Sequence, residues 1–171
     1  MASRGSGSRV KGSEYENKLS HILNKTFGLP NNGDDSFKRR WSGRAETPIG
    51  GDLKHPDWWP WPIEARNREK WDFHMIFKSH ISCPMLKWWR EMTEKNKTDA
   101  LILAFTRNHV PDYVMFDRME LTRVLDLSVD VIDLEDVPVI SLALYGLTIC
   151  RLEDFLAAVK PLRSHMEGMV G

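Results

Sequence analysis

The chain has 171 residues, of which 42% are hydrophobic, and its formal net charge at pH 7 is zero. This length suits one domain of ordinary size, and the balanced charge does not by itself indicate a nucleic-acid partner. No apolar stretch reaches the roughly 18 residues of a membrane span, so we expect no membrane contact and an intracellular location, in the cytoplasm or nucleoid. The two cysteines, Cys83 and Cys150, lack zinc-site spacing and are expected to be buried free thiols.

Positive charge is concentrated at the N-terminal end of the chain. Residues 1–44 hold nine Lys and Arg against four Asp and Glu, a net +5, whereas the remainder holds 15 against 20, a net −5. Such a basic end is compatible with a face that binds phosphate groups. A basic tail without a partner would leave the same pattern, and charge alone does not separate the two interpretations.

The first segment, residues 1–10, is rich in Ser, Gly and Arg and is expected to form a flexible basic arm. One domain over residues 11–171 should follow. Its first helix is predicted to begin at Ser13, a good N-cap, because apolar residues recur behind it at helical spacing. Gly28 and Pro30 should end this helix.

The rest of the chain alternates between strand-like and helical patterns. Helices are expected at residues 84–95 and 152–159. A short strand is expected at residues 38–41, followed by a Ser42-Gly43-Arg44 turn. A second short strand should begin at residue 53, after a turn at Gly50-Gly51. Further strands are expected at residues 62–67, 99–107 and 112–117 and within 137–147. This order predicts an α/β fold, a single domain with a central mixed β-sheet of about five strands flanked by helices.

Glu16 is the first acidic residue in an unusual place. It precedes Leu19 and Leu23 by three and seven residues, which puts its charge on the apolar face of the first helix. A charged group on an inward face needs a partner or a metal ion. Ser13 and Glu16 also fit a capping box, and this segment alone favours that structural interpretation.

Two further acidic residues lie close together in the sequence. Glu64 interrupts a β-like segment, and alternation places Glu64 and Arg66 on one face and Ile63 and Ala65 on the other. The ordinary explanation is a solvent-facing ion pair on a half-exposed strand. Asp52 follows two glycines, which permit a sharp turn and a close approach to other groups, but an ordinary turn aspartate would have the same neighbours.

Taken in order, the helix glutamate, the Gly-Gly-Asp turn and the Ile-Glu-x-basic strand resemble the PD-(D/E)XK nucleases, and within them the archaeal- and phage-type Holliday-junction resolvases. The quoted segments are similar to the family's opening helix, Ser-bearing loop, motif aspartate and Glu-x-Lys strand; they are Lys11-Gly12-Ser13-Glu14-Tyr15-Glu16, Trp41-Ser42-Gly43, Gly51-Asp52 and Ile63-Glu64-Ala65-Arg66. The resemblance extends from about residue 9 to residue 117. Each motif is short, so their order and spacing carry the weight, and the resemblance implies a restriction-endonuclease-like fold.

The resemblance implies an endodeoxyribonuclease that depends on Mg²⁺ or Mn²⁺, hard cations that prefer oxygen ligands. Its catalytic residues would be Glu16, Asp52, Glu64 and Arg66. The metal ligands would be the three carboxylates and the Ala65 carbonyl, while Arg66 would orient the attacking water or contact the scissile phosphate. The residues expected to contact the DNA backbone are Arg9, Lys11, Arg39, Arg40, Ser42 and Arg44.

Arg66 departs from the family pattern, which has lysine at this position. Arginine stays protonated at any working pH and cannot act as a general base, although it can hold a phosphate oxygen. Lys54 and Lys70 lie nearby in the sequence and are alternative sources of a lysine.

The substrate implied by the resemblance is branched DNA, in particular the four-way junction, cut by a homodimer; a phage-encoded enzyme would act in the host cytoplasm. Three alternatives stay open: a PD-(D/E)XK nuclease acting on duplex or flap DNA, a non-catalytic DNA-binding module on this fold, and a small α/β interaction domain whose acidic residues are structural. The tryptophans Trp58, Trp59 and Trp61 could stack on unpaired bases, but packing, against the core or a second subunit, is favoured.

Overall fold

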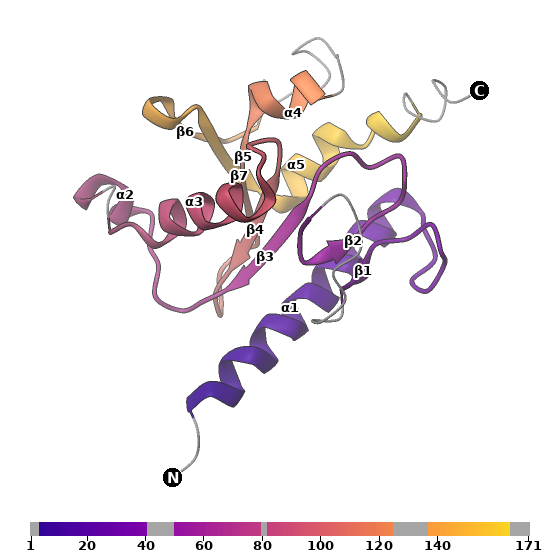
Figure 1. Ribbon diagram of the computed structural model, residues 1–171, viewed down its shortest axis with the longest axis horizontal. Coiled ribbons are helices and arrows are strands. Elements are labelled where there is room, and N and C mark those ends of the chain that lie inside the picture. Colours follow the sequence, from indigo (N-terminus) through magenta and orange to yellow (C-terminus); the bar gives the residue numbers. More distant parts are fainter. Residues whose placement is uncertain (1–3, 41–49, 80–81, 125–136, 165–171) are drawn as a thin grey trace.

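The computed structural model describes residues 4–40, 50–79, 82–124 and 137–164. These residues form a five-stranded sheet with helices on both faces and a two-stranded ribbon beside it (Figure 1). The elements in chain order are α1 (Arg4–Phe27), β1 (Lys38–Arg39), β2 (Leu53–Lys54), β3 (Ile63–Asn67), α2 (His74–Lys78), α3 (Pro84–Asn96), β4 (Ile102–Thr106), β5 (Tyr113–Asp117), α4 (Arg118–Val124), β6 (Ile140–Leu142), the 3₁₀ turn η2 (Ala143–Tyr145), β7 (Leu147–Arg151) and α5 (Leu152–Val159).

The strands of the sheet follow the order β3-β4-β5-β7-β6. β3 and β4 are parallel, which the crossover through α2 and α3 allows. The other neighbours are antiparallel, and β1 pairs with β2 in the separate ribbon. This is the single α/β domain with a central mixed sheet that the sequence predicts, and it is consistent with a restriction-endonuclease-like fold.

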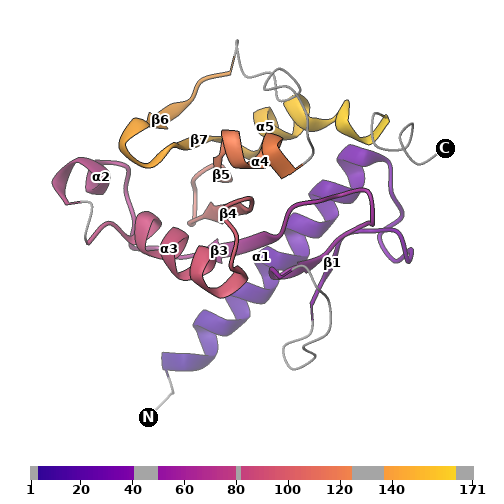
Figure 2. The ribbon, with the colours of Figure 1, turned by 45° about the horizontal axis from the view of Figure 1, so that its top comes forward.

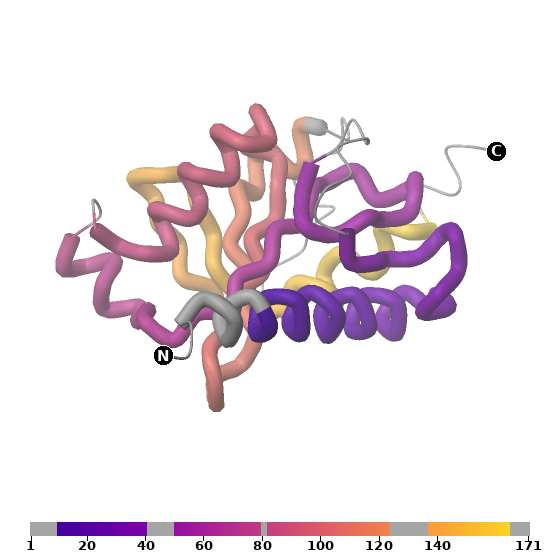
Figure 3. The backbone as a smooth tube through the Cα atoms, turned by 60° about the horizontal axis from the view of Figure 1, so that its bottom comes forward, coloured from indigo at the N-terminus to yellow at the C-terminus, as the bar shows by residue number. Residues whose placement is uncertain are grey.

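The two faces of the sheet build two cores. Alternate strand residues such as Val114 and Phe116 join the apolar residues of α1 and α5, while Leu103 and Met115 join those of α2 and α3. Figures 2 and 3 show α1 along one side of the strands and α3 along the other. Because both faces are covered, every residue of β4 is buried.

α1 begins before its predicted start. Ser13 lies inside the helix, and its hydroxyl donates a hydrogen bond to the Val10 carbonyl (3.0 Å) in the preceding turn. The predicted N-cap at Ser13 is therefore wrong, because a serine hydroxyl can be satisfied within a helix, and the segment from Arg4 onward, expected as part of a flexible arm, is helical. The predicted end is confirmed, since α1 stops at Phe27 and Gly28 has a φ of +65°.

Most later elements lie where the sequence places them, including α3, the β4–β5 hairpin and α5. The strand expected within residues 137–147 is β6, but its partner β7 was not predicted, and neither were the short helices α2 and α4. The turn expected at Ser42 to Arg44 lies outside the described residues. No helix in the described ranges is long and apolar enough to cross a bilayer.

The tryptophans before β3 pack inside the protein. Trp59 and Trp61 are 1% and 0% exposed. The Trp59 indole N–H donates to the Trp61 carbonyl (2.9 Å), and the Trp61 indole N–H donates to the Leu121 carbonyl (3.1 Å). Trp58 is partly buried against the same core. The favoured prediction of packing is confirmed, and this packing fixes the segment that leads into β3.

Candidate active site

Asp52 is carried to β3 by the turn at Gly50 and Gly51. Gly51 has a φ of +104°, and a Cβ atom there would lie 2.8 Å from the Ile63 carbonyl oxygen, so only glycine fits without strain. The Asp52 backbone N–H donates to that same Ile63 carbonyl (2.8 Å). The Asp52 carboxylate, in turn, accepts the backbone N–H of Ala65 at Oδ2 (2.9 Å). The two glycines thus explain how this aspartate reaches the strand that carries Glu64.

Glu64 is fully buried, at 0% exposure, beneath α3. Its Oε1 accepts hydrogen bonds from the Lys95 ammonium (2.8 Å) and the Asn96 amide (3.1 Å), both in the last turn of α3. The Asn96 amide also donates to the Met92 carbonyl (2.9 Å), which fixes it to its own helix. The predicted alternation along β3 is confirmed, and Glu64 and Arg66 do form an ion pair (3.4 Å), but the expected exposure of that pair to solvent is wrong, because α3 covers that face.

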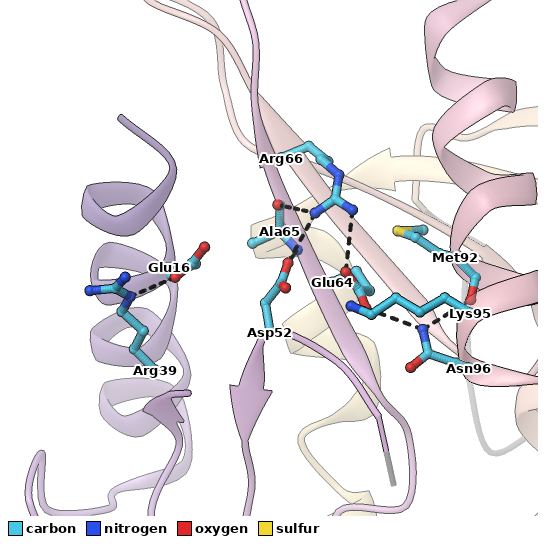
Figure 4. A network of polar contacts seen from close by, with 9 residues as sticks. All are labelled: Glu16, Arg39, Asp52, Glu64, Ala65, Arg66, Met92, Lys95 and Asn96. Carbon is cyan, nitrogen blue, oxygen red and sulfur yellow. Dashed lines mark hydrogen bonds and ion pairs between the residues drawn. The ribbon is translucent and has the colours of Figure 1, made fainter. Parts of the chain in front are cut away.

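Arg66 bridges the oxygen atoms that surround Glu64 (Figure 4). Its Nη1 donates to Asp52 Oδ2 (3.0 Å) and to the Ala65 carbonyl (2.9 Å). Its Nη2 lies 3.4 Å from Glu64 Oε2, close enough for an ion pair. That oxygen is buried and accepts no hydrogen bond from any described residue. Two carboxylates and one carbonyl therefore converge on a single guanidinium.

The two carboxylates differ in their affinity for protons. Burial and the charge of Glu64 raise the pKa of Asp52 to about 6, against the opposing effects of the Ala65 N–H and of Arg66. Burial also raises the pKa of Glu64, but the hydrogen bonds from Lys95 and Asn96, with the charges of Lys95 and Arg66, outweigh it, so the pKa of Glu64 is lowered. The pair thus holds negative charge close together at neutral pH, which a cation would stabilise.

The oxygen atoms at this site fit a hard divalent cation. Asp52, Glu64 and the Ala65 carbonyl supply only oxygen ligands, the kind that Mg²⁺ and Mn²⁺ prefer. The buried Glu64 Oε2, which accepts no hydrogen bond within the described ranges, is an acceptor that such an ion would satisfy. The carboxylate–carbonyl set is therefore chemically suitable for a metal site.

Glu16 is not gathered into the same cluster. The capping-box interpretation is wrong, because Ser13 lies inside α1. The Glu16 carboxylate, whose side chain is 20% exposed, instead accepts a hydrogen bond from Arg39 Nε (2.7 Å), which is the partner that a charge on this face needs. In Figure 4 Glu16 lies on α1, separate from the contacts that join Asp52, Glu64 and Arg66. Among the described residues no three His, Cys, Asp or Glu side chains lie close enough to share a metal ion.

The basic residues predicted to contact DNA have different surroundings. The Arg40 backbone N–H donates to the Asp52 carbonyl (3.0 Å). This bond places Arg40 next to Asp52, and burial lowers the pKa of its side chain, opposed by the charges of Glu64 and Asp52. Lys11 forms a half-exposed ion pair with Glu69 (3.0 Å), and Arg39 binds Glu16. Ser42, Arg44 and the side chain of Arg9 lie outside the described part of the structure.

The sequence analysis did not identify the lysine that contacts the acid pair. Lys54 and Lys70, the two suggested substitutes, are exposed and make no contact with Asp52 or Glu64 in the described structure. Lys95 makes that contact from a position 31 residues away from Glu64. Its helix was predicted, but nothing in a single sequence shows that the end of that helix lies over β3.

A buried Glu-x-Arg strand, a Gly-Gly-Asp turn hydrogen-bonded to it and a helix-covered mixed sheet together define a domain of the PD-(D/E)XK nuclease class. Residues 7–163 match the family described as "Phage putative PDDEXK endonuclease", and the chain belongs to that family. Nucleases of this superfamily generally use divalent metal ions. No curated protein matches the chain, and no solved structure matches it either.

Proposed function

We propose that this protein is a DNA endonuclease that hydrolyses phosphodiester bonds with the help of Mg²⁺ or Mn²⁺. The observation that carries the proposal is the convergence of Asp52, Glu64 and the Ala65 carbonyl on the Arg66 guanidinium, where Glu64 Oε2 is buried and accepts no hydrogen bond from the described residues. Membership of an endonuclease family supports it. In a phage such an enzyme would work in the host cytoplasm.

The ligands of the ion would be Asp52, Glu64 and the Ala65 carbonyl, with Glu16 as a further carboxylate from α1. A bound divalent ion supplies charge neutralisation at the phosphate and lowers the pKa of water. In the reaction the oxygen of a water molecule bonds to phosphorus and the bond from phosphorus to the leaving oxygen breaks. The proton lost by the water passes to solvent, and the leaving oxygen takes up a proton.

The protein's own residues hold this arrangement together. Arg66 fixes Asp52 and the Ala65 carbonyl through Nη1 (3.0 and 2.9 Å), and its planar fork presents further N–H donors. The charges of the acid pair act on the pKa of the Arg40 side chain, and Arg40 is suited to hold a phosphate nearby. Lys11 can exchange its exposed partner Glu69 for a phosphate at little cost. Arg9, Ser42 and Arg44 complete the proposed backbone contacts.

The substrate we propose is branched DNA, with the four-way junction as the preferred form. The resemblance to junction resolvases and the basic N-terminal 44 residues favour it. Duplex or flap DNA is the alternative for a nuclease of the same superfamily. Arg66, in place of the family's lysine, favours a second alternative in which the protein binds DNA without cutting it.

One cleavage assay tests these proposals. Four-way, flap, single-stranded and linear duplex DNA are incubated with the protein in Mg²⁺, Mn²⁺ or EDTA. Cleavage should require a metal ion and should be abolished by Asp52→Asn and by Glu64→Gln, while DNA binding in EDTA persists. Asp57 is an exposed aspartate in the same segment, so Asp57→Asn is the matched control and should cut normally. Circular dichroism shows whether each variant is folded.

The outcomes separate the alternatives. Full activity of both carboxylate variants would remove these residues from the metal site. Tight DNA binding without cleavage under every condition would favour the non-catalytic module. Equal cleavage of linear and branched DNA would favour a general nuclease over a junction-selective one.

A further inference from the structure

We infer that Lys95 is a catalytic residue of this nuclease, with its ammonium donating a hydrogen bond to a non-bridging oxygen of the scissile phosphate. The inference rests on the proposed function. It assigns the role to a side chain in the last turn of α3, a separate element from the β3 strand on which the sequence motif lies.

The first support is position. The Lys95 ammonium lies 2.8 Å from Glu64 Oε1, so it is at hydrogen-bond distance from one of the proposed metal ligands. In Figure 4 the side chain runs from α3 toward Glu64, with its amine end beside the carboxylate. Asn96 donates to the same oxygen (3.1 Å) and to Met92 in its own helix (2.9 Å), which fixes the end of α3 against Glu64.

The second support is access. The Lys95 side chain is 56% exposed, although its partner Glu64 is 0% exposed. The ammonium therefore stands where the buried acid pair meets solvent, the side from which DNA must approach. An ammonium group has three donors, and Glu64 Oε1 is the hydrogen-bond acceptor that Lys95 has within the described residues, so donors are left for a phosphate oxygen.

Arg66 is less suited to the same task. Its side chain is 23% exposed, and its Nη1 already donates to Asp52 and to the Ala65 carbonyl. A guanidinium committed to the ligands holds them in place, whereas charge that grows on phosphate oxygens during hydrolysis needs donors aimed at the phosphate. The structure thus divides two tasks between two cations, with Arg66 holding the carboxylates and Lys95 facing the phosphate.

The test compares Lys95→Met and Lys95→Arg with wild type under single-turnover conditions at saturating Mn²⁺. Lys87→Met, an exposed lysine on the same helix that pairs with Glu91, is the matched control. We expect Lys95→Met to cut about 100-fold more slowly, the loss typical for removal of one preorganised donor, and Lys95→Arg to retain more activity. DNA affinity in EDTA should change by less than about threefold, because the donor acts mainly on the transition state.

Two readouts separate this role from mere support of Glu64. Calorimetry without DNA should show that Lys95→Met binds Mn²⁺ at least as tightly as wild type, because a nearby positive charge has been removed. Alkylation of the thiol introduced by Lys95→Cys with 2-bromoethylamine restores an amine of the same reach but lower pKa. It should recover cleavage and move the alkaline limb of the pH–rate profile to lower pH. Cys83 and Cys150 are buried, and burial with the charge of Asp154 raises the pKa of Cys150 to about 12, so both should stay unmodified.

Cleavage by Lys95→Met within threefold of wild type would overturn the inference and leave the proposed function intact. Weaker Mn²⁺ binding, with the rate restored by excess Mn²⁺, would also overturn it, since Lys95 would then only support Glu64. A folded wild-type protein that cuts none of the four DNAs with either metal would overturn the proposed function itself, and the role of Lys95 with it.

Discussion

At the scale of single residues, one glycine determines whether the acid pair can form. Gly51 adopts a φ of +104°, and a Cβ atom there would meet the Ile63 nitrogen and carbonyl oxygen at 2.9 and 2.8 Å. Both contacts are with backbone, which cannot move without disturbing β3. The Gly-Gly-Asp motif is therefore explained by close approach of two backbone segments, and the sequence allowed this interpretation without showing which strand is approached.

Gly51→Ala should accordingly destabilise the protein by about 2–4 kcal/mol, because it combines left-handed strain with a backbone clash. Gly28→Ala is the control. Gly28 has a φ of +65°, but a Cβ atom added there would have no neighbour within 4 Å, so only the conformational cost of about 1 kcal/mol applies. Urea denaturation of the two variants measures the difference, and equal losses would contradict the proposed close approach.

The raised pKa of Asp52 gives a second prediction, in which stability falls as pH rises. The folded protein binds the Asp52 proton more tightly than the unfolded chain, with a pKa of about 6 against an ordinary 3.8. Between these values only the folded state holds this proton, so the contribution of Asp52 to stability without metal should decrease from pH 4 to pH 6.5 and then level off, whereas Glu64, whose pKa is lowered, contributes in the opposite direction at acid pH. Asp52→Asn should remove this decrease and be more stable by about 3 kcal/mol at pH 7.5 in EDTA.

Urea titrations at several pH values in EDTA test this sign. Added Mg²⁺ should stabilise wild type and close the gap to Asp52→Asn, because the ion binds only the folded acid pair. The exposed Asp57→Asn should follow wild type throughout. An Asp52→Asn protein that is less stable than wild type at pH 7.5 in EDTA would contradict the prediction.

At the scale of elements, the sequence predicted what is local and missed what depends on tertiary contact. Periodicity identified α3 and the alternation along β3, so Glu64 and Arg66 were correctly placed on one face. It could not show that α3 covers this face. The burial of Glu64 and its contact with Lys95 are therefore seen only in the structure. The predicted start of α1 was wrong for a related reason, because a serine such as Ser13 suits both an N-cap and a helix interior.

The attachment of α1 to the β1–β2 ribbon is a similar tertiary feature. Asn24, 1% exposed, donates from Nδ2 to the Phe37 carbonyl (3.0 Å) and accepts the Phe37 N–H at Oδ1 (2.8 Å). Asn24→Ala would leave two buried backbone groups without partners, and we expect a loss of about 2–4 kcal/mol. Asn17→Ala, exposed on the same helix, should change stability by less than about 0.5 kcal/mol. Thermal melting of both variants measures the effect, and a small loss for Asn24→Ala would show that the ribbon is held by other contacts.

At the scale of the whole molecule, the sheet ends in an edge strand with apolar side chains beside it. β6 is the last strand in the order, and Val139, Leu144 and Tyr145 around it are 43%, 79% and 41% exposed. Exposed apolar side chains of this kind beside an edge strand suit contact with a second copy of the chain. We therefore propose that the homodimer implied by the resemblance forms through β6, away from the N-terminal end of α1, which lies on the opposite side in Figures 1 and 2.

Such a dimer would match the substrate proposed for it. One copy offers one acid pair, whereas resolving a four-way junction requires two cuts, and a two-fold dimer supplies two sites at a fixed separation. Light scattering should give about twice the 19.8 kDa chain mass. Leu144→Glu should shift the mass toward the monomer, and Val10→Glu, at a residue of α1 that is 52% exposed, should not.

Competition assays should favour junctions over linear duplex by about tenfold or more, with affinity falling steeply as salt increases, because the basic residues hold phosphates and not bases. A monomer that cuts linear duplex as fast as junctions would contradict both the dimer and the junction preference, and the acid pair would then serve a general endonuclease.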